Sequence, residues 1–357
     1  PAFRSRWYIS LLGALMAIYL MFKISTPYAL LAGVMMVLIY LMVSHYHKDR
    51  KGMQDIFRAA VYQFSRNFQI YMQRKARRGR RPEWRPAAVC LSLKRITEDR
   101  SFDLLSWISY RFGFGTYIYL KEGYFSSKTN EDAQEELHEM LGYATRKNSN
   151  VYVDILISPS YTGAISQIIQ LPGVAGMDNN LFIFGFDRHD PQELPRIVEN
   201  VALVSAGNFD VGVFAAGPLQ QKPSQGIDIW LRSGDVMNAN LMILLAYIIH
   251  GHRDWRKGKI RIFETCREDE AAQTRERLLE LVQKGRLPIL PGNIQVMVKR
   301  EDISARALIN THSAGTGLVI AGFRKELLKH EGEKVFQGYQ LNGDMLFLNA
   351  SSIKEIF

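Results

Sequence analysis

The chain opens with two apolar runs. Trp7–Phe22 and Tyr28–Val43 each hold sixteen residues without a charge, and a short polar break at 23–27 separates them. A helix needs about 20 apolar residues to cross a bilayer core, so each run is slightly short but compatible with a span. We predict two transmembrane helices in residues 1–45, and a buried helical hairpin of a soluble protein is the alternative.

A different periodicity follows in residues 46–83. Apolar side chains recur every three or four positions between 52 and 72, which predicts an amphipathic helix. This connector ends in a basic cluster, a lipid-facing candidate because juxtamembrane basic residues attract anionic headgroups. The alternative is a plain cytoplasmic anchor. The cluster consists of Arg74, Lys75, Arg77, Arg78, Arg80 and Arg81.

From residue 84 onward, short apolar runs alternate with helical patterns, which predicts a mostly parallel sheet covered by helices. The order of elements predicts two similar five-stranded halves, 84–218 and 219–357, in a cytosolic α/β domain. This arrangement resembles the universal-stress-protein fold. The first series of strands is 88–93, 116–120, 151–157, 181–186 and 211–214. The second series is 227–231, 259–263, 294–298, 317–320 and 346–348.

The net charge of +10 is concentrated near the apolar runs. Residues 44–85 carry +9, whereas residues 86–357 are nearly neutral. This distribution argues against nucleic acid as a partner and, by the positive-inside rule, places both ends of the hairpin in the cytoplasm. The two cysteines, Cys90 and Cys266, are too few for a disulfide framework and agree with a reducing compartment. We expect a multi-pass protein of the inner or plasma membrane, cytoplasmic after about residue 45.

Motifs for chemistry are weak throughout the chain. There is no phosphate-binding G-x-x-x-x-G-K-[ST] loop and no G-x-S-x-G nucleophile turn. His250 and His252 lack further ligands at metal spacing, and we interpret them as helix C-terminal residues. Asp228 and Asp235 bracket a strand-to-helix turn, where a carboxylate can cap the helix. We expect no enzyme activity, no metal and no cofactor.

One small polar loop before a predicted strand is a weak candidate for nucleotide contact, although such a loop is more often a simple turn. Its candidate residues are Thr311, Ser313, Gly315 and Thr316.

Several segments resemble the C-terminal end of the cation–chloride cotransporters. They are Trp84-Arg85-Pro86 before an apolar strand, the glycine-flanked strand in 173–186, and the stretches 227–230, 240–247 and 255–263. Two departures, the turn Ser233-Gly234-Asp235 and a compact segment between 284 and 294, resemble a prokaryotic or divergent member of the wider amino acid–polyamine–cation transporter superfamily.

The resemblance implies a secondary transporter that moves chloride with sodium and/or potassium. Its ion sites would lie in upstream helices outside this sequence, so no ion-binding residue is named. The hairpin would be the last two spans in the lipid bilayer. The connector helix and cytosolic domain would regulate a homodimer. A related amino-acid permease and a membrane-tethered nucleotide-binding sensor are the alternatives.

Overall fold

The computed structural model describes residues 7–46, 51–76, 84–174, 178–218, 225–285, 287, 289–298 and 303–355. The chain divides into two compact units, residues 1–71 and 72–357. The first unit holds the helices α1 (Trp7–Ile24) and α2 (Thr26–Tyr46). The helix α3 (Lys51–Ala76) follows them and reaches the boundary of the second unit.

Both apolar helices form where the hydrophobic pattern predicts them, but the predicted membrane spans are not confirmed. Within the described residues, no helix is both long enough and apolar enough to cross a bilayer.

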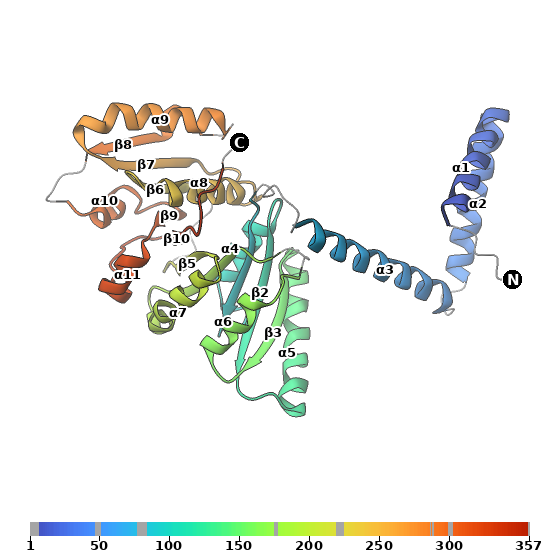
Figure 1. Cartoon of the computed structure of the whole chain (residues 1–357), viewed down its shortest axis with the longest axis horizontal. Helices are drawn as coiled ribbons and strands as arrows, with labels where there is room; N and C mark the ends of the chain where they lie inside the picture. The colour runs from blue at the N-terminus through green and yellow to red at the C-terminus, as the bar shows by residue number, and fades with distance from the viewer. Residues whose placement is uncertain are drawn as a thin grey trace. The chain divides into compact units, whose positions relative to one another are not determined.

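The second unit begins with the first series of strands and helices (Figure 1). These are β1 (Ala87–Ser92), α4 (Ser101–Ser109), β2 (Phe114–Glu122), α5 (Ser127–Arg146), β3 (Tyr152–Ser158), α6 (Tyr161–Gln170), β4 (Leu181–Asp187), α7 (Leu194–Ala206) and β5 (Asp210–Ala216). A 3₁₀ turn, η1 (Pro191–Glu193), precedes α7.

The second series repeats this order with one helix or turn between successive strands. It comprises β6 (Ile227–Arg232), α8 (Val236–His250), β7 (Ile260–Cys266), α9 (Ala271–Lys284), β8 (Ile294–Val298), α10 (Ala305–His312), β9 (Leu318–Gly322), α11 (Lys325–Glu331) and β10 (Asp344–Asn349). Short 3₁₀ turns lie at Glu268–Glu270 (η3), Pro291–Asn293 (η4) and Gly332–Val335 (η5).

All ten strands belong to one continuous sheet in the order β3-β2-β1-β4-β5-β10-β9-β6-β7-β8. Within each series every pairing is parallel, and the two series have the same internal order. They join where β5 and β10 pair antiparallel, with Phe347 opposite Val213. The predicted mostly parallel α/β fold is therefore confirmed. The antiparallel joint gives each series a partner strand instead of an open edge.

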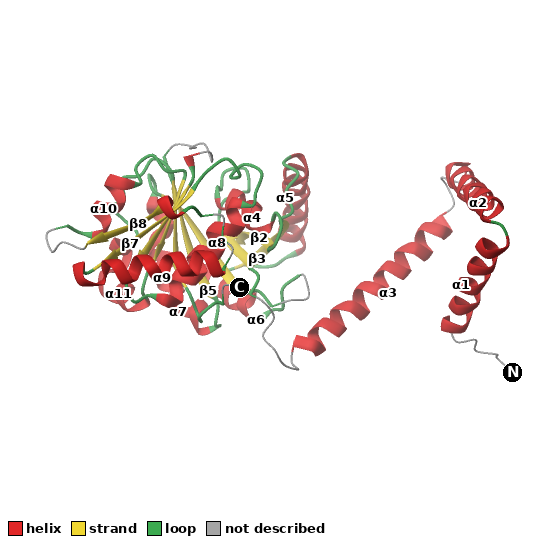
Figure 2. Cartoon of the chain, turned by 90° about the horizontal axis from the view of Figure 1, so that it is seen from above, coloured by secondary structure: helices red, strands yellow, loops and turns green. Residues whose placement is uncertain are grey.

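Helices cover both faces of the sheet, and the strands fan out as it twists (Figure 2). One core packs α4, α5, α8 and α9 against the sheet, and the other packs α6, α7, α10 and α11. Along β1, Ala88 and Cys90 face the first core, whereas Val89 and Leu91 face the second. Successive side chains of a strand point to opposite faces of the sheet, and here both faces are buried. This explains why the strands are continuous apolar runs in the sequence.

The two series also share a close contact between a strand glycine and the helix after the first strand. A Cβ atom at Gly185 in β4 would overlap the Ser101 side chain at the start of α4. A Cβ atom at Gly322 in β9 would lie 3.3 Å from the side chain of Asn238 near the start of α8. Each glycine precedes a phenylalanine. The Gly-Phe pair therefore occurs at the same position in both series of strands.

Candidate functional site

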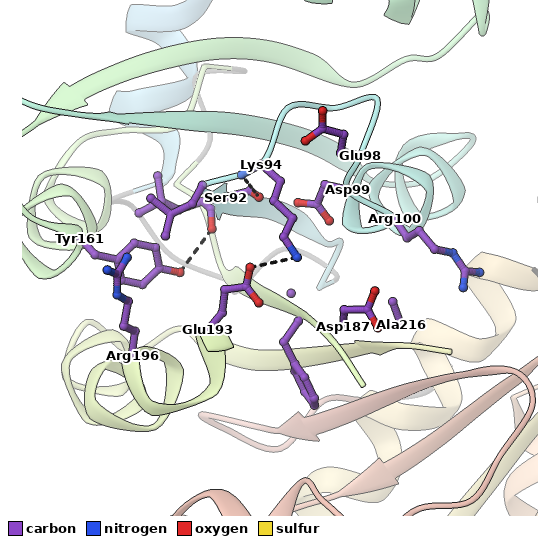
Figure 3. Close-up of a pocket in the computed structure, with 14 residues that line it drawn as sticks. Ser92, Lys94, Glu98, Asp99, Arg100, Tyr161, Asp187, Glu193, Arg196 and Ala216 are labelled. Atoms are coloured by element: carbon purple, nitrogen blue, oxygen red, sulfur yellow. Dashed lines mark hydrogen bonds and ion pairs between the residues drawn. The ribbon is translucent and has the colours of Figure 1, made fainter. Parts of the chain in front are cut away.

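A pocket lies where the strand order of the first series reverses, between β1 and β4 (Figure 3). In open α/β sheets, ligands bind at this switch point beyond the carboxyl ends of the strands. The lining residues come from the ends of β1, β4 and β5 and from the segments that lead into α4, α6 and α7. They are Leu91, Ser92, Leu93, Lys94, Glu98, Asp99, Arg100, Tyr161, Gly185, Phe186, Asp187, Glu193, Arg196 and Ala216.

The three cationic side chains of this pocket are each paired with a carboxylate. Lys94 lies 2.9 Å from Glu193. Arg100 lies 2.6 Å from Asp344 at the start of β10. Arg196 lies 3.3 Å from Glu122 at the end of β2. An incoming anion would have to compete with a carboxylate at every one of these cations.

The pKa values of two charged groups at this pocket are shifted by burial and by their ion-pair partners. Partial burial by itself disfavours the charged ammonium of Lys94, but the hydrogen bond and charge of Glu193 outweigh it and raise the pKa of Lys94. Burial raises the pKa of Asp344, which Arg100 partly offsets. Lys94 is therefore protonated at neutral pH, and its charge is held by Glu193.

Two tyrosines fix the loop after β1. The Tyr117 hydroxyl lies 2.7 Å from the carbonyl oxygen of Lys94 and 2.9 Å from an oxygen of Asp99. The Tyr161 hydroxyl donates to the carbonyl oxygen of Leu91 at 3.3 Å. Burial raises the pKa of both phenols, so they remain neutral donors. The loop is thus held from both sides of the sheet.

The pocket is also small. Its volume is about 80 Å³, whereas sites for small organic ligands enclose about 300–1,000 Å³. The space fits a few water molecules rather than a nucleotide. The corresponding switch point of the second series lies between β6 and β9. There the side-chain nitrogen of Asn238 lies 3.4 Å from the carbonyl oxygen of Phe323, and its side-chain oxygen accepts from the Ala350 N–H at 2.7 Å.

The nucleotide candidates of the sequence lie elsewhere, at the opposite, amino end of β9. Thr311 is in the last turn of α10 and donates to the carbonyl oxygen of Ala307 at 2.9 Å. Ser313 and Thr316 are buried and donate to the same oxygen of Asp228, each at 2.6 Å. Gly315 lies between them in the turn. The structure therefore brings Ser313 and Thr316 together around a carboxylate of the protein, whereas Thr311 is paired within α10.

Asp228 is the centre of this second cluster, and its role differs from the predicted one. It does not cap α8, because Asp235 holds that position and accepts from the Asn238 N–H at 3.3 Å. Asp228 lies inside β6, where Arg261 of β7 donates to both its oxygens at 2.7 and 2.6 Å. Asp228 faces position 261 across β6 and β7 in the register of the sheet, so the pairing depends on strand order that spacing alone does not reveal.

The remaining sequence candidates give no further site. Arg74 and Lys75 lie in the last turn of α3 with side chains outside the described part, and Arg77, Arg78, Arg80 and Arg81 fall outside the described residues. His250, in the last turn of α8, makes a 2.9 Å hydrogen bond with the carbonyl oxygen of Gly258. Among the described residues, no group of three histidines, cysteines or carboxylates is placed to hold a metal ion.

Comparisons with solved structures give partial likenesses. The cytoplasmic domain of a prokaryotic cation chloride cotransporter has a TM-score of 0.48 at 16% identity and covers 76% of this chain and 98% of its own. A putative universal stress protein from Pseudomonas aeruginosa UCBPP-PA14 has a TM-score of 0.46 at 13% identity, covering 73% and 92%.

Sequence comparison finds similarity to cation–chloride cotransporters. No family model matches the chain. Potassium/chloride cotransporter 3 of Caenorhabditis elegans is 22% identical over 279 residues, which are 74% of this chain and 25% of that protein. Cation-chloride cotransporter 2 of Oryza sativa subsp. japonica is 22% identical over 302 residues, 76% and 29%. The chain thus spans about a quarter of the length of these relatives. To the extent of these matches, the chain is similar in sequence to the cation–chloride cotransporter family.

Proposed function

We propose that this chain is the C-terminal regulatory part of a secondary transporter that moves chloride together with sodium and/or potassium. The observation that carries the proposal is the sequence match to two cotransporters over about three quarters of the chain. The α/β unit supplies no transport path in this proposal. Its role is to control the rate and assembly of the membrane part.

The site geometry supports a regulatory rather than an enzymatic role. A catalytic pocket needs space for substrate and a reactive group that is free to act. The switch-point pocket offers about 80 Å³, and its cations are held by Glu193, Asp344 and Glu122. We propose that the cytosolic unit is not an enzyme and that the ion pairs of this pocket stabilise the folded domain.

The apolar helices support attachment to lipid. Side chains such as Leu12, Leu31 and Met42 expose 63–65% of their surface. Water-exposed apolar surface on this scale is unfavourable by about 25 cal/mol per Å². We propose that α1 and α2 contact the bilayer and that residues after about 45 are cytoplasmic.

The connector helix supports a homodimer. Val61, Phe64 and Phe68 lie on one stripe of α3 and expose 51–72% of their surface. The rings of Phe64 and Phe68 stack with centroids 6.2 Å apart. We propose that α3 packs on α3 of a second copy. Disulfide cross-linking of Phe64→Cys tests this contact, because Cys90 and Cys266 are buried. Val61→Asp should abolish the cross-link, and a cross-link that is absent in the otherwise native Phe64→Cys chain refutes the contact.

Transport is tested on the native polypeptide that contains this chain, reconstituted in proteoliposomes. We expect rubidium or sodium uptake that requires chloride and stops when gluconate replaces it. Uptake driven by an amino acid and indifferent to chloride would instead identify a permease. A second sample that lacks residues 84–357 should transport at a changed rate. An unchanged rate would refute the regulatory role.

A further inference from the structure

A hollow on the surface of the α/β unit lies where α4 and α8 meet. Helix α4 packs against the turn that follows α8 through a T-shaped contact between Trp107 and Trp255, with ring centroids 5.0 Å apart. A second contact of this kind joins Tyr110 and His252 at 4.6 Å. Beside these rings, the hollow has a volume of about 200 Å³. Its lining residues are Arg111, Phe112, Tyr247, His250, Gly251 and Arg256, here called the crossing patch.

The crossing patch combines exposed basic and aromatic side chains. Phe112 and Tyr247 expose 41% and 37% of their surface, and Arg111 and Arg256 are also exposed. No carboxylate lines the hollow. The nearby Asp254 lies within ion-pair distance of Arg253 and His252 instead. Neither lining arginine forms an ion pair with any described residue.

Helix ends explain only part of this composition. Basic side chains near the C-terminal ends of α4 and α8 offset the negative end of the helix dipole. That effect does not account for two large aromatic side chains left in solvent beside the arginines. Arginine next to tyrosine or phenylalanine is the chemistry that favours the interface of a bilayer, where headgroups meet acyl chains.

The chain enters the α/β unit beside the segment that follows α4. Phe114, two residues after Phe112, donates its N–H to the carbonyl oxygen of Pro86 at 2.8 Å. Pro86 comes three residues after the connector of residues 46–83, which ends in the basic cluster. An anionic surface that attracts this cluster would also attract Arg111 and Arg256, which carry charge of the same sign. The connector itself is a poor occupant, because its charge has the same sign.

We infer that the crossing patch binds the anionic phospholipid surface of a membrane. Arg111 and Arg256 contact phosphate and carboxylate groups of the lipids, and Phe112 and Tyr247 enter the headgroup layer. The inference rests on the proposed membrane attachment, and it adds a second, reversible contact made by the folded domain. A second copy of this chain, through the exposed acidic residues of α5, is the competing occupant that the experiment separates.

The test places an environment-sensitive fluorophore at position 112 of the whole chain (Phe112→Cys), since both native cysteines are buried. The chain is reconstituted in phosphatidylcholine vesicles with or without about a third phosphatidylserine. With phosphatidylserine we expect a blue-shifted emission and quenching by spin-labelled lipid. Without it, or at high salt, we expect the spectrum of a hydrated dye. Tyr247→Cys gives a second label position, and Tyr124→Cys, 80% exposed on a distant loop, is the control.

Charge variants complete the test. In the labelled chain, Arg111→Gln with Arg256→Gln should reduce the ratio of membrane-bound to free patch roughly 10- to 30-fold, as loss of two juxtamembrane charges predicts. Arg324→Gln with Lys329→Gln removes the same charge from α11 and should leave the signal unchanged.

Each outcome has one meaning. Chains that float with vesicles but give the same emission at 112 with and without phosphatidylserine overturn the inference alone. Chains that float with neither vesicle overturn the proposed membrane attachment as well. An emission shift that needs no vesicles and grows with protein concentration shows that a second copy covers the patch, which also overturns the inference.

Discussion

Asp228→Asn tests whether the loop at 311–316 is structural. The Asp228 side chain is 1% exposed and accepts four hydrogen bonds, two from Arg261 and one each from Ser313 and Thr316. The Trp230 indole in turn donates to the Ser313 hydroxyl at 2.9 Å. Asparagine keeps the shape, but it loses the charge and turns an N–H toward groups that donate.

The magnitude follows from burial. Breaking a fully buried ion pair by removing one partner costs about 3–5 kcal/mol. Arg261 is 35% exposed and can regain water, so we expect a smaller loss of about 2–3 kcal/mol in the free energy of unfolding. With a urea slope of about 3 kcal/mol/M for a domain of this size, the midpoint should fall by roughly 1 M.

Urea unfolding followed by tryptophan fluorescence measures the change. Asp132→Asn, an exposed position on α5, is the matched control and should stay within about 0.5 kcal/mol of the parent. Arg261→Gln should cost less once Asp228→Asn is present, because the two share the interaction. A midpoint for Asp228→Asn equal to that of the control would refute the reasoning. So would stabilisation of the parent by ATP that is lost in Ser313→Ala.

Three further outcomes are expected in the same assay. Lys354→Met should lower the free energy of unfolding by about 3 kcal/mol, because it leaves Asp210 buried without the cation that lies 2.8 Å away. Adding Asp210→Asn should recover part of this loss, and no recovery would contradict the pairing. Burial lowers the pKa of His252 below its usual 6.5, so the fold requires the neutral ring. The free energy of unfolding should be highest above about pH 6.5 and should decline as the pH falls toward the lower pKa of the folded state. For His252→Gln, the dependence of this free energy on pH between about 7 and 5 should be weaker than in the parent. An unchanged dependence would contradict this. Gly185→Val should lower the free energy of unfolding by about 1–3 kcal/mol, because the added Cβ would overlap the Ser101 side chain. Adding Ser101→Gly to the same chain should relieve this overlap. If Gly185→Val alone is as stable as the parent, the contact is loose.

The switch-point pocket shows where motif reasoning reaches its limit. The sequence lacks a phosphate loop, and the cations of this pocket are each paired with a carboxylate. The pairing itself could not be predicted, since Arg100 and Asp344 are separated by 244 residues. The sheet brings them together because β5, at the end of the first series, pairs with β10, which Asp344 begins.

The pattern of apolar residues determined the local structure of this protein. Ten apolar runs became ten strands because each run supplies side chains to two cores, and local periodicity is enough to mark such a strand. Charge, likewise a local property, marked residues 46–83 as a basic connector.

Tertiary structure alone decided the long-range features: the antiparallel joint of β5 with β10, the assignment of Ser313 and Thr316 to Asp228, and the exposed hollow between α4 and α8. Each depends on which distant segments become neighbours. That choice is made by packing and strand pairing over the whole domain, and it leaves little mark on the residues nearby in sequence.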